Sequence, residues 1–137
     1  MKLTADTNVL VRTVLNDDPD QSIVAIAALN AAEIIAVTLP ALCEFVWVLG
    51  RGYKREARDI AAAIRHLIDS PAVQVDRPAI EAGLAILEAG GDFADGVIAF
   101  EGRRLGGEIF LSFDTGAVKR LKAGGVQARL LSNTRPD

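Results

Sequence analysis

The chain has 137 residues, half of them hydrophobic, and a formal net charge of −3 at pH 7. This length suits one domain with a substantial core, and the hydrophobic content excludes a disordered chain. A single cysteine, Cys43, excludes an internal disulfide. With only one histidine as well, His66, the chain is unlike a structural zinc site or a histidine-dependent hydrolase. Any chemistry must therefore come mainly from carboxylates, hydroxyls and basic side chains.

Short apolar runs alternate with helical periodicity, which predicts an α/β fold with a parallel sheet and a single domain over residues 1–137. The clearest helix places Ile60, Ile64 and Ile68 on one face, and Pro71 ends it. In chain order we expect a strand over 2–5, a helix over 7–15, a helix starting at 18–21, a strand over 34–37, a helix from 40 to 50 or 52, the helix around 60–68, a strand over 73–75, helices over 76–90 and 92–105, a strand over 108–113, a helix over 115–123, a strand over 126–131 and a frayed tail over 132–137.

The expected location is the cytoplasm. A lone cysteine suits a reducing compartment. The apolar stretches are too short, and too often interrupted by polar residues, to span a bilayer. Asp6 also falls where a secretory signal would need an unbroken apolar region. We therefore expect a cytoplasmic protein that does not associate with a membrane.

Two of the predicted strands are followed by an aspartate. Asp6 follows the strand over 2–5, and Asp114 follows the strand over 108–113. In an open parallel sheet, ligands bind beyond the carboxyl ends of the strands, so both carboxylates would point into one crevice. The alternative is that each aspartate only caps the helix that follows it.

Three further acids lie in otherwise apolar helical segments. Asp95 is three residues after Asp92, so the two share a helix face. Glu44 interrupts the apolar run over 39–49, which contains no other charge. A buried carboxylate needs a partner or a metal ion. A solvated helix face for Glu44, and a helix-dipole role for the two aspartates, stay open as alternatives.

Taken together, Asp6, Glu44, Asp95 and Asp114 indicate hydrolysis of phosphodiester bonds with a divalent metal. Mg²⁺ binds hard oxygen ligands, keeps several waters and needs only a few carboxylates. One or two such ions polarise a phosphoryl oxygen and lower the pKa of an attacking water, and no histidine is required.

The same residues carry a resemblance to a known family. The order Asp6-Thr-Asn-Val-Leu, Glu44 in an apolar helix, Asp95-Gly-Val-Ile-Ala and Ser112-Phe-Asp114 is similar to PIN domains of the VapC type. The resemblance extends from Asp6 to about residue 131. It implies a three-layer α/β/α fold with a five-stranded parallel sheet in the order 3-2-1-4-5.

The resemblance also implies a function, a cofactor and partners. It implies a metal-dependent endoribonuclease that acts as the toxin of a toxin–antitoxin pair, with Mg²⁺ or Mn²⁺ as cofactor and RNA as substrate. The implied protein partner is a cognate antitoxin that blocks the acidic site, within a homodimer or a toxin–antitoxin hetero-oligomer. By position, the implied metal-site acids are Asp6, Glu44, Asp95 and Asp114, and the implied accessory residues are Asp92, Thr7, Asn8 and Ser112.

Two positions depart from the family pattern. Gly96 stands where the family usually has alanine, and we expect this glycine to loosen its helix without removing a ligand. The residues after Asp114 are Thr-Gly-Ala-Val rather than a charged residue with an aromatic one. This difference makes Asp114 a candidate for an indirect or second-metal ligand.

Two groups of basic side chains are candidates for contact with an RNA backbone or an acidic partner surface. For the first group, the alternative is a solvated helix start. The first group comprises Arg51, Lys54, Arg55 and Arg58 around Tyr53, and the second comprises Arg103, Arg104, Lys119, Arg120 and Lys122.

Four other residues are expected to be structural. Phe45 and Trp47 lie in an apolar helix, where aromatic side chains usually pack. Cys43 is expected to be a small core residue, and His66 a partly exposed helix residue.

Two other functions stay open. A PIN-fold nuclease that processes RNA, or acts on DNA, would have no antitoxin. A non-catalytic binding module would use its acids only as helix caps. Metal-dependent cleavage of RNA would separate the nucleases from the module, and a neighbouring antitoxin gene would separate the toxin from the processing nuclease.

Overall fold

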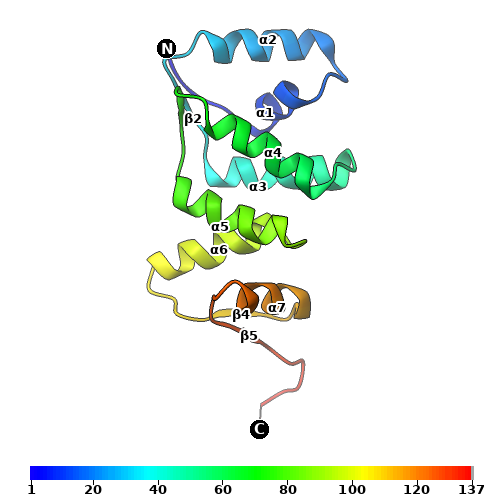
Figure 1. The fold of residues 1–137 in the computed structure, drawn as a ribbon, viewed down its shortest axis with the longest axis vertical. Coiled ribbons are helices and arrows are strands. Elements are labelled where there is room, and N and C mark those ends of the chain that lie inside the picture. The colour runs from blue at the N-terminus through cyan, green and yellow to red at the C-terminus, as the bar shows by residue number, and fades with distance from the viewer. Residues whose placement is uncertain (137) are drawn as a thin grey trace. The chain divides into compact units, whose positions relative to one another are not determined.

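The computed structural model describes residues 1–136. The chain divides into two compact units, here called unit 1 (Met1–Arg77) and unit 2 (Pro78–Asp137), and each is described by itself. Figure 1 shows the chain coloured from blue at the N-terminus to red at the C-terminus. Of the predicted tail, residue 137 lies outside the described residues, and residues 132–136 have no helix or strand.

Unit 1 contains a three-stranded parallel sheet. Its strands β1 (Lys2–Thr4), β2 (Ile34–Ala36) and β3 (Val73–Gln74) lie in the order β1-β2-β3, so that β2 is central. The register sets Leu3 opposite Ile35. Parallel neighbours need long crossover connections, and helices supply them here.

Five helical segments belong to unit 1. The side chains of Asp6, Asp18 and Thr38 accept hydrogen bonds from backbone N–H groups in the first turns of the helices that follow them. These caps satisfy N–H groups that have no partner inside a helix, so they set where each helix begins. The segments are α1 (Thr7–Val14), α2 (Pro19–Asn30), α3 (Leu39–Trp47), the π-helical turn η1 (Val48–Gly52) and α4 (Ala57–Ile68).

Helix α4 has the predicted amphipathic pattern. Ile60, Ile64 and Ile68 are buried, whereas Arg58 and Arg65 are exposed. Each fully buried isoleucine stabilises the fold by roughly 1.5–3 kcal/mol relative to an exposed one. The helical period of the apolar residues therefore predicts the buried face correctly.

The expectation that Trp47 packs in the core was wrong. Trp47 is 64% exposed, whereas Phe45, two residues earlier on α3, is 1% exposed. Two residues along an α-helix are turned by about 200° from each other, so the two rings point to opposite sides. Cys43 is only half-buried, and His66 is exposed on α4.

A polar cluster joins the end of α1 to the segment after η1. Arg12 forms an ion pair with Asp17, and the Tyr53 hydroxyl donates a hydrogen bond of 2.8 Å to the other oxygen of Asp17. The hydrogen bond from Tyr53 is the main cause that lowers the pKa of the Asp17 carboxyl, and the charge of Arg12 adds to it. The cluster therefore favours the ionised form of Asp17.

We expect the substitution Asp17→Asn to remove part of the acid sensitivity of the fold. A carboxyl whose pKa is lowered by folding stabilises the native state above its unfolded pKa, and this contribution is lost as the pH falls through the folded pKa. The free energy of unfolding, measured by urea denaturation from pH 7 down to pH 3, should fall less steeply for the variant. Superimposable pH profiles would contradict this role for Asp17.

Unit 2 holds a two-stranded parallel sheet and three helices. Phe110 lies opposite Ala128 in the sheet, and α7 connects the two strands and packs against them (Figure 1). Their common core includes the buried Ile86, Val118 and Leu121. The elements are α5 (Arg77–Glu88), α6 (Phe93–Arg104), β4 (Phe110–Ser112), α7 (Thr115–Ala123) and β5 (Ala128–Leu130).

Helices α5 and α6 approach each other at two buried glycines. A Cβ atom on Gly96 would lie 2.4 Å from the carbonyl oxygen of Ala82, and one on Gly83 would lie 2.6 Å from the ring of Phe93. Gly96 therefore permits close contact between α6 and α5, a packing role that the sequence did not reveal.

We expect Gly96→Ala to lower the free energy of unfolding by about 1–3 kcal/mol, since an added methyl group in a tight contact forces the backbone apart. Gly102→Ala is the matched control, because Gly102 is on the same helix and a Cβ there meets no atom within 4 Å. That control should be stabilising by about 0.5–1 kcal/mol. Chemical denaturation of both variants tests this, and equal effects would refute the packing argument.

The predicted α/β class is confirmed, and the strand order agrees as far as it is described. The two sheets contain the neighbours 3-2, 2-1 and 4-5 of the predicted order, and the five-strand order as a whole stays a prediction. The strands are shorter than the apolar runs, although Ala5 and Val37, at the ends of two of these runs, still donate hydrogen bonds across the sheet to the carbonyl groups of Ala36 and Gln74. No helix within residues 1–136 is both long enough and apolar enough to cross a membrane.

Candidate active site

Asp6 lies two residues beyond the end of β1, at the N-cap of α1. Buried Ala5 continues the line of the strand, and its N–H donates a 3.1 Å hydrogen bond to the carbonyl of Ala36. The Oδ1 atom of Asp6 accepts a 3.1 Å hydrogen bond from the N–H of Val9. The capping role is thus present, and within residues 1–136 no hydrogen bond is formed by Oδ2 of this exposed carboxylate.

Thr7 connects α1 to Glu44 on α3. Its hydroxyl donates a 2.8 Å hydrogen bond to Oε2 of Glu44 and lies 3.5 Å from the carbonyl oxygen of Ala41. Because Thr7 directly follows Asp6, this bond brings the carboxylate of Glu44 to the N-terminal end of α1. Glu44 is exposed, as one of the two interpretations of its position expects. Asn8 is exposed on α1 and makes no side-chain hydrogen bond within the described residues.

Asp92 and Asp95 have different roles at the start of α6. Asp92 is the N-cap, and its Oδ1 accepts a 2.9 Å hydrogen bond from the N–H of Ala94. Asp95 lies in the first turn, is half-buried, and accepts no side-chain hydrogen bond from any described residue. Helix capping therefore accounts for an aspartate at position 92 but not for one at position 95.

Asp114 occupies in unit 2 the place that Asp6 occupies in unit 1. It lies two residues beyond the end of β4 and caps α7, with Oδ1 accepting a 3.1 Å hydrogen bond from the N–H of Ala117. The N–H of Asp114 donates a 2.9 Å hydrogen bond to the hydroxyl oxygen of Ser112. Ser112 therefore fixes the backbone that carries this acid.

The three aspartates of unit 2 lie within electrostatic reach of one another. Burial raises the pKa of Asp95 above its ordinary value, and the charges of Asp92 and Asp114 raise it further. The charge of Arg120 acts in the opposite direction. In unit 2 the charges of Asp92 and Asp114 thus act on Asp95, and in unit 1 the hydroxyl of Thr7 links Glu44 to the residue next to Asp6.

The four cations of the first basic group are exposed, and one of them, Arg58, forms an ion pair on the surface. Arg51, Lys54 and Arg55 are exposed around the end of η1. Tyr53 instead bonds to Asp17, and Arg58 pairs with Glu56 at 3.1 Å on the surface.

In the second basic group, Arg103 and Arg104 are exposed in the last turn of α6. The Arg104 guanidinium lies 4.5 Å from the centre of the Phe100 ring. Eight residues of helix, about 12 Å, separate Arg103 from Asp95. The cation that acts on Asp95 is Arg120, which sequence reasoning placed in this group without linking it to a particular acid.

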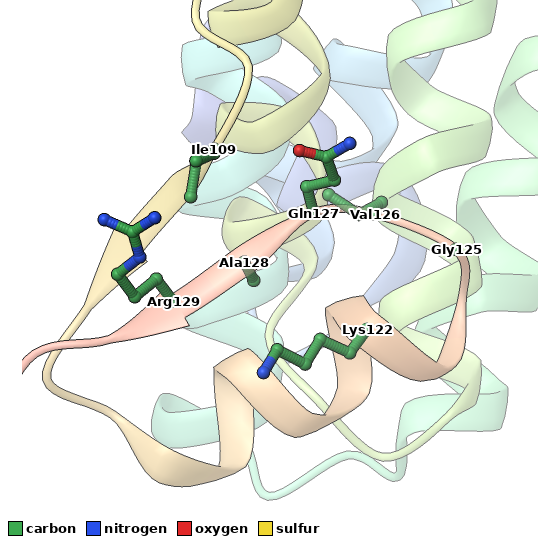
Figure 2. Close-up of a pocket in the computed structure, with 7 residues that line it drawn as sticks. All are labelled: Ile109, Lys122, Gly125, Val126, Gln127, Ala128 and Arg129. Carbon is green, nitrogen blue, oxygen red and sulfur yellow. The ribbon is translucent and has the colours of Figure 1, made fainter.

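A hollow of about 450 Å³ lies on unit 2, beside α7 and β5 (Figure 2). Lys122 of α7 and Arg129 of β5 are its charged residues, and none of the predicted acids lines it. The hollow offers positive charge and no carboxylate. The other lining residues are Ile109, Gly125, Val126, Gln127 and Ala128.

The chemistry of the acids fits a divalent metal ion. Within residues 1–136, no three histidine, cysteine, aspartate or glutamate side chains are grouped so that they could hold one. However, Asp92, Asp95 and Asp114 offer hard carboxylate oxygens, and Asp95 is partly desolvated between like charges. A divalent cation would relieve that repulsion, and carboxylate oxygens are the ligands that Mg²⁺ prefers.

Comparison with known proteins identifies the family. The PIN domain model matches residues 4–123, which include Asp6, Glu44, Asp95 and Asp114. The chain belongs to the PIN domain family. PIN domains have a three-layer α/β/α fold with a parallel sheet and are in general metal-dependent nucleases. A search of curated proteins gave no significant match.

Proposed function

We propose that this PIN domain is an endoribonuclease and that Asp6, Glu44, Asp95 and Asp114 bind its Mg²⁺ or Mn²⁺. The observation that carries the proposal is the state of Asp95, which is half-buried, lacks hydrogen-bond donors among residues 1–136 and lies among other carboxylates. Such a group is unfavourable in a protein interior unless a cation binds it. Acids whose pKa is shifted by burial and by neighbouring charges are typical of functional sites.

The side chains around the acids prepare them for this role. When bound, the metal ion polarises the phosphoryl oxygen and lowers the pKa of the attacking water. The Thr7 hydroxyl holds one oxygen of Glu44 and leaves the other free to act as a ligand. Capping bonds orient Asp6 and Asp114 at the starts of their helices. Carboxylates held in this way bind a cation without first losing side-chain freedom.

The test is cleavage of labelled single-stranded RNA by the purified full chain, with Mg²⁺, Mn²⁺ or EDTA, beside DNA of the same sequence. We expect cleavage of RNA that needs either metal. Cleavage of DNA alone would favour a DNA-directed nuclease. Cleavage of neither would favour the non-catalytic module, for which the capping bonds of Asp6, Asp92 and Asp114 are the supporting observation.

We further propose that the nuclease is the toxin of a toxin–antitoxin pair, active as a homodimer or held in a hetero-oligomer with a small antitoxin. The support is an apolar surface on unit 1, where Ile23 and Val24 of α2 are each 68% exposed and Ile26 is 43% exposed. Exposed apolar patches of this kind mark protein interfaces. A groove of about 610 Å³ lined by residues of α1, α2 and α4 adjoins it. Helix α3 is a weaker candidate, since its large apolar residues apart from Trp47 are buried.

We expect the chain to co-purify with the product of a small neighbouring gene and to lose RNA cleavage in that complex. The double variant Ile23→Asp, Val24→Asp should weaken the complex at least about tenfold, because it places charge in an apolar contact. RNA cleavage by the isolated variant should be unchanged. A chain that cleaves RNA, is harmless when overproduced and co-purifies with nothing would favour an RNA-processing nuclease.

A further inference from the structure

Arg120 lies beside the acids of unit 2 without pairing with any of them. Its positive charge acts on Asp95. Within residues 1–136, however, no ion pair or hydrogen bond is formed by its guanidinium group. The side chain is half-buried, so it is not simply extended into solvent. The N–H donors of this arginine are therefore available to a ligand.

Two glycines make room for this side chain. A Cβ atom on Gly91 would lie 2.7 Å from Cδ of Arg120. A Cβ atom on Gly116 would lie 3.0 Å from Nη1 of Arg120 and 3.3 Å from Oδ1 of Asp114. Gly116 is one turn before Arg120 on the same face of α7. The guanidinium of Arg120 and the carboxylate of Asp114 therefore flank the same point above Gly116.

The local charge distribution singles out Arg120. The chain carries no acid between Asp114 and residue 137, but it carries five cations there: Lys119, Arg120, Lys122, Arg129 and Arg135. Lys122 and Arg129 line the separate hollow of Figure 2. Of the five, Arg120 is the one whose charge acts on Asp95.

We propose that Arg120 binds a phosphate group of the RNA substrate beside Asp95 and Asp114. This inference rests on the proposed nuclease function and assigns a substrate-binding residue to it. Carboxylates repel an incoming polyanion, so the phosphate needs a cationic contact supplied by the protein itself. A guanidinium group presents a planar fork of N–H donors that matches two phosphate oxygens. Because Gly116 has no side chain, the guanidinium group of Arg120 lies close to the carboxylate of Asp114, so a phosphate bound by Arg120 would lie beside the acidic group.

The competing explanation is that Arg120 only offsets the repulsion among the acids. In that case its removal would lower the melting temperature and leave RNA affinity unchanged. Any cation would then serve equally, including a lysine. A phosphate-binding arginine instead changes RNA affinity and its salt dependence, because each phosphate contact releases counterions from the nucleic acid.

The experiment measures binding of a fluorescent single-stranded oligoribonucleotide by the full chain in EDTA, by anisotropy, over a series of KCl concentrations. The variants are Arg120→Ala and Arg120→Lys, with Lys122→Ala as a control that removes one charge from the same helix. Circular dichroism melts accompany each measurement. EDTA separates binding from cleavage, so this test and the cleavage test of the proposed function can fail independently.

We expect Arg120→Ala to weaken binding about tenfold near physiological salt, which corresponds to about 1.4 kcal/mol. The slope of log affinity against log salt should fall by about 0.7, the value for one phosphate contact to a single strand. Arg120→Lys should keep the slope but recover only part of the affinity, because it restores the charge and not the fork. Lys122→Ala should change affinity by less than about twofold, since Lys122 is turned by about 200° from Arg120 around α7 and lines the hollow of Figure 2 instead.

Three results would overturn the proposal. One is unchanged affinity and slope in a folded Arg120→Ala chain. Another is an equal loss in Lys122→Ala, which would show a general charge effect. The third is a wild-type chain that binds no RNA even at low salt. If Arg120→Ala does not fold, full wild-type affinity in Arg120→Lys would overturn it as well.

Discussion

Replacing Asp95 or Asp6 by asparagine is expected to lower RNA cleavage by about 10²- to 10³-fold while the chain stays folded. Loss of one preorganised electrostatic contact at a reaction centre has effects of this size. Asparagine keeps the shape of aspartate but loses the charge that binds a hard cation. It also caps helices as well as aspartate does, so the cap that Asp6 forms with Val9 should survive. Initial rates of cleavage of a labelled RNA at saturating Mg²⁺ measure the effect.

The chain offers a matched control for each substitution. Asp18 caps α2 through the N–H of Gln21, as Asp6 caps α1, and it follows no strand. Glu101 is an exposed acid on α6, the helix that carries Asp95. Asp18→Asn and Glu101→Gln should therefore cleave within about twofold of the wild-type rate, since neither is a proposed ligand. Comparable losses in a control and its partner, or near wild-type cleavage by folded Asp95→Asn, would show that the acids are assigned wrongly.

The second large effect concerns stability without metal, where Asp95→Asn is expected to raise the melting temperature. Burial and the charges of Asp92 and Asp114 raise the pKa of Asp95 in the folded chain. A carboxyl with a raised folded pKa stabilises the fold below its unfolded pKa, and that contribution is lost as the pH rises through the folded pKa. At neutral pH the ionised Asp95 therefore destabilises the metal-free protein. The gain in the variant should be largest at neutral pH and disappear near pH 3.

Magnesium should stabilise the wild type more than the Asp95→Asn variant. An ion that binds only the native state stabilises it by about 2.7 kcal/mol at 100 times its dissociation constant. For a chain of this size that is roughly 5–15 °C in melting temperature. Wild type should show this gain and Asp95→Asn should show much less of it. Paired melts in EDTA and in Mg²⁺, with Glu101→Gln as the control, measure both effects.

A purely structural role for Asp95 predicts the reverse signs. An aspartate in the first turn of a helix interacts favourably with the helix dipole, by about 0.3–1 kcal/mol. Its replacement by asparagine would then lower the melting temperature slightly, and Mg²⁺ would stabilise neither chain. A wild type that responds to neither Mg²⁺ nor Mn²⁺ would refute the metal-dependent nuclease.

Local sequence signals located the acids within the secondary structure. Asp6 and Asp114 each lie two residues past a parallel strand and at a helix N-cap, as the apolar runs and capping residues predicted. Strand and helix starts depend on residues within about four positions along the chain, which a single sequence displays. The same local rules predicted the buried face of α4.

Those local signals do not predict contacts between segments that lie far apart in the sequence. The bond from Thr7 to Glu44 joins residues 37 positions apart, and nothing local to either residue specifies it. Trp47 was misassigned because an apolar run does not reveal which side of its helix faces the core. The packing role of Gly96 was not predicted, because the adjacent backbone belongs to a different helix, α5.

The amino-acid sequence by itself determined the α/β class, the parallel strands, the helix caps and the presence of acids at strand ends. Each of these follows from short-range sterics and hydrogen bonding or from hydrophobic period. Only the tertiary structure decided that Asp95 is partly desolvated among like charges and that Arg120 lies beside it, unpaired, over Gly116. Desolvation and Coulomb interactions depend on distances through space, and these arise from packing between elements that the chain order does not encode locally.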